Sequence, residues 1–251
     1  MENTNEVKYD FPTEEIELPS KGLIYPEDNI LSSGKIIMKY MTAKEEDILT
    51  NQGYIQKGIV LDKVMQALIV SKINYNDLIV GDKNAIMVAA RILGYGKDYT
   101  FEYDGTEHNI DLSTIDNKPF ELVNKGVNEF NFTLPSTGVN ITYKLLTHGD
   151  EKKITTELEG LKKINKDASP ELSTRLKYMI TSVEGEREAK VIREFIDKRL
   201  LARDSRELRK HIKLTQPDVD LTFFPDGSST GVDIPIGVKF FWPDFWDSTN
   251  S

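Results

Sequence analysis

The segment from Met41 to Tyr103 most constrains the fold, because helix signals of different kinds agree along it. Thr42 and Glu45 have the spacing of a capping box, in which a hydroxyl and a carboxylate satisfy backbone donors where a helix starts. Further along, apolar residues recur at three- and four-residue intervals, which gives a second helix a stripe to bury: Val64, Met65, Leu68 and Ile69. The pattern predicts a packed group of helices.

A third helix is predicted later in the same segment. Asp82 is suited to be its N-cap, because an aspartate oxygen can accept a hydrogen bond from a backbone N–H of the first turn. Gly94 and Gly96 are expected to end it. Ile86, Ala89, Ala90 and Leu93 share one face of this helix, and the two small alanines permit close helix packing. None of these residues forms a catalytic pattern, so we interpret the segment as scaffold.

The residues ahead of this segment carry weaker signals. Residues 1–15 are mostly polar, and we expect a flexible arm there. The stretch Leu18 to Pro26, LPSKGLIYP, combines two prolines and a glycine with apolar anchors. Two interpretations stay open: a turn that pins the chain onto a core, which we favour, or an extended ligand segment for another protein. Residues 34–40 alternate and predict a strand.

Three antiparallel hairpins and a second helical region are predicted in the rest of the chain. The hairpins span Tyr99–Leu112, with the strong turn signal Asp104-Gly105, then Glu129–Thr147 and Leu221–Ile236. Between the last two, residues 149–215 have helical periodicity. Ser169 and Pro170 are expected to begin a helix that runs through Ile180, and Asp204 or Ser205 to cap the last helix.

These elements predict an α+β fold: a helical centre with antiparallel β-hairpins, a second helical region and a C-terminal hairpin. We expect an N-terminal α+β domain over residues 16–127. A C-terminal domain of hairpin, helices and terminal hairpin is expected over residues 128–251.

Composition excludes several classes of function. Of the 251 residues, 39% are hydrophobic, which is enough for a substantial core, and the net charge of -9 opposes general binding to nucleic acids or anionic membranes. The absence of cysteine excludes disulfides and thiolate metal sites. No apolar run approaches the roughly 20 residues that span a bilayer, and no signal-peptide pattern begins the chain. We therefore expect a soluble protein made without export.

Candidate catalytic and metal-ligating residues are few. His108, His148 and His211 fall in separate predicted elements and lack zinc-binding spacing. The stretches Gly94–Lys97 and Gly227–Gly231 lack the surroundings of a phosphate loop and of a nucleophile elbow. We expect no enzyme activity, no catalytic residue, no metal and no cofactor.

The helical region from Arg193 to Lys213 holds the strongest charge pattern. Arg203, Arg206 and Lys210 fall roughly on one helix face and can dock an acidic partner surface. The alternative is a solvated face with internal ion pairs, because acidic residues interleave at helical spacings: Glu188, Glu194, Asp197, Asp204 and Glu207. Both interpretations stay open.

The aromatic tail from Phe240 to Trp246 is interpreted as part core and part interface. Side chains alternate in an extended segment, so Phe240 and Trp242 are expected to be buried on one side. Phe241 and Trp246 are expected to be more exposed and to anchor a partner, since large aromatics are enriched at interface hot spots.

An ordered series of motifs resembles the base plate protein family of T-even-like contractile-tailed bacteriophages, from about Leu18 to Pro243. The motifs are LPSKGLIYP, MTAKEEDIL, VGDKNAIMVAARILGYG, KLLTHGD, DSRELRKHI followed by PDVD, and IPIGVKFFWP. That family comprises baseplate hub subunits and hub assembly proteins. Relatives often carry cysteine pairs near the first and last hairpins, which suggests metal-stabilised turns. This sequence has none, so the resemblance implies no metal site here.

The resemblance implies a bacteriophage tail baseplate hub subunit or hub assembly factor, a late structural protein or assembly chaperone that acts by binding other phage baseplate hub proteins. It implies a location in the host bacterial cytoplasm during assembly, and the virion tail baseplate as a second one. A small-molecule substrate, a membrane or a nucleic acid is not expected as a partner. Two alternatives of other classes stay open: a cell-wall hydrolase of the tail and a nucleic-acid-binding adaptor.

Overall fold

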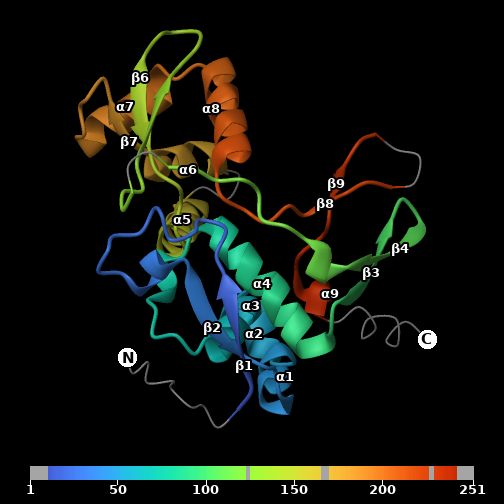
Figure 1. Ribbon diagram of the computed structural model, residues 1–251. Coiled ribbons are helices and arrows are strands. Elements are labelled where there is room, and N and C mark those ends of the chain that lie inside the picture. The colour runs from blue at the N-terminus through green and yellow to red at the C-terminus, as the bar shows by residue number, and fades with distance from the viewer. Residues whose placement is uncertain (1–10, 123–124, 165–169, 226–228, 242–251) are drawn as a thin grey trace.

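The computed structural model describes residues 11–122, 125–164, 170–225 and 229–241 (Figure 1). In its first part, β1 (Thr13–Glu17) pairs antiparallel with β2 (Lys35–Lys39), and Ile16 opposes Ile36. The short 3-10 helix η1 (Ile30–Ser33) lies between these two strands. The predicted group of helices follows β2, with a second short 3-10 helix among its connections: α1 (Ala43–Leu49), α2 (Gln52–Gln56), α3 (Val60–Leu68), η2 (Tyr75–Asp77) and α4 (Val80–Tyr95).

The helix ends in this part confirm some predictions and correct others. At the start of α1, the backbone N–H and the hydroxyl of Thr42 donate to the Glu45 carboxylate at 3.0 and 2.7 Å, so the predicted capping box is present. Gly94 does not end α4, because it lies inside the helix against the Met41 side chain. Gly96 does end it, with a φ of 82° that an L-residue rarely adopts.

Asp82 is not an N-cap, which corrects the sequence-based prediction. The helix α4 begins two residues earlier, and Asp82 is its third residue, fully buried. Its carboxylate accepts hydrogen bonds from the Ser20 backbone N–H at 3.0 Å, the Ser20 hydroxyl at 2.8 Å and the Tyr25 hydroxyl at 2.6 Å. The stretch Leu18 to Pro26 is therefore the turn that we favoured, held on the core by Asp82.

Small antiparallel sheets complete the α+β fold, as predicted. β3 (Asp98–Tyr103) and β4 (Thr106–Asp111) pair across Asp104 and Gly105, whose φ values of 51° and 72° suit a type I′ turn. The other strands form a three-stranded sheet of order β5-β6-β7 and a short final pair: β5 (Phe130–Thr133), β6 (Asn140–Tyr143), β7 (Ile180–Val183), β8 (Thr222–Phe223) and β9 (Val232–Asp233).

The second helical region contains α5 (His148–Ile164), α6 (Glu171–Met179), α7 (Ala189–Lys198) and α8 (Ala202–Thr215). Ile180 does not continue α6, because its backbone has β geometry; it begins β7, an edge strand of the three-stranded sheet, and pairs with Tyr143 of β6. Pro170 occupies the N-cap position of α6 instead of the first helical position, and Ser169 lies outside the described residues.

Contacts cross the predicted domain boundary at residues 127 and 128, and the division itself stays a prediction. The backbone N–H of His148 donates to the Leu78 carbonyl at 2.7 Å, and Ile79 forms an isolated β-bridge with Thr147. At Gly81, an added Cβ would lie 1.9 Å from the Pro217 carbonyl oxygen, so only glycine fits where the chain crosses α4.

The last described segment returns to the first part of the chain. In Figure 1, β8 and β9 lie beside β3 and β4, and the Phe101 and Phe223 rings are 5.3 Å apart. The short helix α9 (Val238–Phe241) packs on α4, where Arg91 Nε donates to the Phe240 carbonyl at 2.9 Å. Among the described residues, no helix has the length and apolarity to cross a bilayer.

Candidate protein-binding surface

The helix α8 packs one face on the three-stranded sheet and leaves the other face to solvent (Figure 1). Leu208 and Ile212 are buried on the packed face. The ring of His211 lies 4.8 Å from that of Phe132, which places the helix against β5. This packing fixes the direction in which the opposite face points.

Asp204 holds the start of α8 to the β5–β6 turn, and neither it nor Ser205 is the N-cap that the sequence predicted. The helix begins at Ala202, so Asp204 is its third residue. Its carboxylate accepts hydrogen bonds from the Ser136 backbone N–H at 2.8 Å and the Thr137 hydroxyl at 3.0 Å. The carboxylate is thus used to attach a distant turn.

Arg203, Arg206 and Lys210 are exposed on α8, which agrees with their predicted place on one face. None of them forms a salt bridge with a residue that the structure describes. Glu207 is the exposed acid of this helix, since Asp204 is buried. The face is a concentration of positive charge on a chain whose net charge is -9.

The neighbouring helix α7 behaves differently. Its Lys198 pairs with Glu194 at 3.1 Å, and its Asp197 pairs with Lys177 of α6 at 2.9 Å. The Arg199 guanidinium lies 5.5 Å from the centre of the Phe195 ring. Internal ion pairs of the kind expected for a solvated face therefore occur on α7, whereas the three cations of α8 form no salt bridge among the residues that the structure describes.

The prediction for the aromatic tail was wrong at Phe241. Residues Val238–Phe241 form a helix instead of an extended segment, so neighbouring side chains do not alternate between two sides. Phe240 and Phe241 are both buried, and their rings meet edge to face with centres 5.7 Å apart. Trp242 and Trp246 lie outside the described residues.

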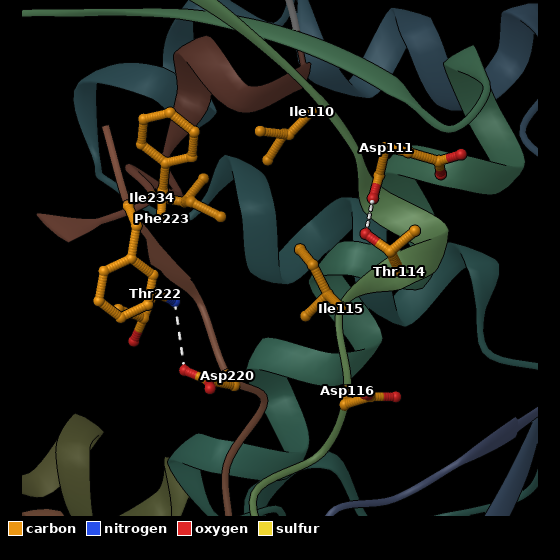
Figure 2. Close-up of a pocket in the computed structure, with 10 residues that line it drawn as sticks. Ile110, Asp111, Thr114, Ile115, Asp116, Asp220, Thr222, Phe223 and Ile234 are labelled. Carbon is orange, nitrogen blue, oxygen red and sulfur yellow. Dashed lines mark hydrogen bonds between the residues drawn. The ribbon is translucent and has the colours of Figure 1, made fainter. Parts of the chain in front are cut away.

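A groove of about 280 Å³ lies between η3 (Leu112–Thr114) and the segment that leads into β8 and β9 (Figure 2). Figure 2 shows Asp111 at the end of β4, Asp116 on the segment that follows, and Asp220 on the segment ahead of β8. Apolar side chains complete the lining, among them Ile110, Ile115, Phe223, Phe224 and Ile234.

The groove residue Asp111 and the core residue Asp82 have pKa values shifted in opposite directions. Hydrogen bonds from Lys97 and Ser113 lower the pKa of Asp111 to about 2, so this groove residue stays ionised. Burial raises the pKa of Asp82, but that carboxyl is fully buried and already bound by Ser20 and Tyr25. It cannot reach a substrate.

A second polar cluster, which the sequence did not predict, joins α5 to the first part of the chain. Asp62 accepts hydrogen bonds from Lys83 Nζ at 2.8 Å and from the Tyr75 hydroxyl at 3.0 Å, and His148 Nδ1 lies 3.2 Å from Lys83 Nζ. These residues come from four separate elements, so no local motif reveals them. Within the described residues, no cluster of histidine and acidic side chains is suited to hold a metal ion.

Comparisons of the chain with protein-family models, with curated proteins and with solved structures found no match.

Proposed function

We propose that this chain is a subunit or assembly factor of a phage tail baseplate hub and that it works by binding another hub protein through α8. The observation that carries the proposal is the exposed cationic face of Arg203, Arg206 and Lys210, which form no salt bridge with the residues that the structure describes. A folded helix with its opposite face buried presents these charges in fixed positions. The partner then carries a complementary acidic surface, which speeds encounter and selects orientation. The resemblance of the ordered motifs supplies the class of partner.

The other two classes of function have less support. A cell-wall hydrolase needs an accessible carboxylic acid with a raised pKa next to a second carboxylate, and Asp82, whose pKa is raised, is sealed in the core. A nucleic-acid adaptor needs a wider positive surface than one face of α8, because phosphate contacts must outweigh the net charge of -9. We therefore propose no enzyme activity, and host cytoplasm during tail assembly as the place of action.

The test is charge reversal of the face in infected cells. A tagged chain with Arg203→Glu, Arg206→Glu and Lys210→Glu should recover no hub protein and support no hub assembly, while its thermal unfolding shows that it remains folded. The matched control reverses three exposed lysines on other helices or helix ends: Lys44, Lys57 and Lys190.

The control variant changes the net charge by the same amount, so it separates the α8 face from a general charge effect. Hub assembly should continue with the control variant. Normal assembly with the α8 variant, or failure of the wild-type chain to recover a hub protein, contradicts the proposal.

A further inference from the structure

His148 lies at a joint between α5 and the first part of the chain. It is the first residue of α5, and its side chain meets three other elements: α3 through Asp62, η2 through Tyr75 and α4 through Lys83. The His148 and Tyr75 rings are packed edge to face with centres 4.7 Å apart. The backbone N–H of His148 also donates to the Leu78 carbonyl, so side chain and main chain bind the same region.

The contact with Lys83 is compatible with only one protonation state of His148 Nδ1. A lysine ammonium has only donors, so the 3.2 Å contact between Lys83 Nζ and His148 Nδ1 is a hydrogen bond only when Nδ1 carries no proton. The proton of a neutral ring is then on Nε2, which lies 3.7 Å from Asp62 Oδ2. Neutral His148 therefore accepts a hydrogen bond from Lys83, and its Nε2–H lies near Asp62 at a distance longer than a hydrogen bond.

The surroundings of the ring oppose its protonation on balance. Burial and the charge of Lys83 lower the pKa of His148 from its usual 6.5, whereas Asp62 acts in the opposite direction. On α5 itself, Lys152 lowers this pKa and Glu151 raises it. Tyr75 stays a neutral donor, because burial and the nearby Asp62 raise the pKa of its hydroxyl.

We propose that His148 makes this joint acid-sensitive: a proton on Nδ1 replaces the hydrogen bond to Lys83 by repulsion between two cations and loosens α5 from α3 and α4. The freed region includes the β-bridge between Ile79 and Thr147 and the close approach of Gly149 to the Asn76 carbonyl. The inference is independent of the proposed hub function, since it concerns how the two parts of one chain are held together.

The direction of the pH dependence follows from the difference in proton binding between the folded and unfolded chains. The unfolded chain binds a proton at the usual histidine pKa of about 6.5, and the folded chain binds it only at lower pH. The contribution of His148 to stability is therefore fully present above about pH 6.5 and is lost as pH falls through the folded-state pKa. Each unit by which the folded-state pKa lies below 6.5 makes the loss about tenfold in the opening equilibrium.

Two measurements on the full chain test the proposal. NMR titration of the three imidazole rings should show that His148 titrates below 6.5. Hydrogen exchange, corrected for the intrinsic pH dependence of amides, should show that protection of the His148 amide, which donates to the Leu78 carbonyl across the joint, falls between about pH 8 and pH 5.

Variants separate the acid effect from simple packing. His148→Gln should remove the pH dependence of this protection, whatever its stability at neutral pH, whereas the matched changes His108→Gln and His211→Gln should retain it. Lys83→Met should shift the His148 titration to higher pH, because it removes the opposing cation. A His148 titration at or above 6.5 in the wild type, or unchanged titration in Lys83→Met, overturns the proposal.

Discussion

Asp82 and Asp204 occupy the same position in two different helices but have different structural roles. Each is the third residue of its helix, and each accepts hydrogen bonds from a turn 62 or 68 residues away. Asp82 binds Ser20 and Tyr25 and completes the interior of the first part. Asp204 binds the exposed β5–β6 turn and steadies the helix that presents Arg203 outward. An aspartate at the third position of a helix therefore binds a distant turn in both cases, but it stabilises the core in one case and a surface helix in the other.

The environments of the two carboxyl groups also shift their pKa values in opposite directions. Burial raises the pKa of Asp82, and the hydrogen bonds from Tyr25 and Ser20 offset this only in part. Burial raises the pKa of Asp204 too, but the hydrogen bonds from Ser136 and the charge of Arg203 outweigh it, so its pKa lies below the usual range. The same helix position can thus favour either protonation state.

The largest expected effect is the loss of stability from Asp82→Ala. The change leaves the Ser20 N–H and hydroxyl and the Tyr25 hydroxyl without an acceptor in the core, so unfolding free energy should fall by about 3 kcal/mol or more. Asp204→Ala should cost less, because Ser136 and Thr137 are exposed and can bind water. Urea unfolding of both variants measures the difference, and equal losses would break the comparison.

The second prediction is that the two carboxyls affect pH dependence with opposite signs. Asp82 binds a proton more readily in the folded chain, so its favourable contribution is present below 3.8 and is lost as pH rises through its raised pKa. Asp204 binds a proton less readily when folded, so its contribution is present above 3.8 and is lost as pH falls through its lowered pKa.

The measurement compares unfolding free energy across pH for Asp82→Asn, Asp204→Asn and the wild type. Relative to the wild type, Asp82→Asn should gain stability as pH rises above 3.8, and Asp204→Asn should gain stability as pH falls below 3.8. Parallel pH curves for the two variants would show that the two environments do not differ as described.

A smaller effect is expected when one donor is removed from each carboxylate. Tyr25→Phe should cost about 1 to 3 kcal/mol, because the buried hydrogen bond to Asp82 is lost and the Ile79 N–H loses its acceptor, while Ser20 still binds the Asp82 carboxylate. Thr137→Val should change stability by less than about 0.5 kcal/mol, because Thr137 is a surface residue. Thermal unfolding of the two variants side by side would contradict this order if Thr137→Val were the more damaging.

Signals within a few residues predicted structure well in this chain, and long-range pairing did not follow from them. The capping box of Thr42 and Glu45 could be predicted because both partners lie in one turn. Asp82 and Asp204 have a sequence typical of N-caps, but their partners come from distant turns that only the folded chain brings close. The prediction that Phe241 is exposed was wrong for another reason: the four-residue helix Val238–Phe241 is too short for a helical period to be visible in the sequence.

The candidate surface was partly predictable because its residues lie close together in the sequence. Helical spacing placed Arg203, Arg206 and Lys210 on one face, and the structure agrees. Whether they pair internally depends on tertiary neighbours, which spacing does not give. The joint at His148 was missed because its partners Asp62 and Lys83 belong to other elements.

The most direct test of the account is the association rate between the purified chain and the proposed hub partner, measured across salt concentrations. Reversal of Arg203, Arg206 and Lys210 should leave the chain folded and change unfolding free energy by no more than about 1.5 kcal/mol, because the three residues are exposed and, among the residues that the structure describes, only Arg203 acts on a structural carboxylate, that of Asp204. It should slow association at least about tenfold at low salt and remove most of the salt dependence. An association rate and salt dependence equal to those of the wild type would contradict the claim that α8 is the docking surface.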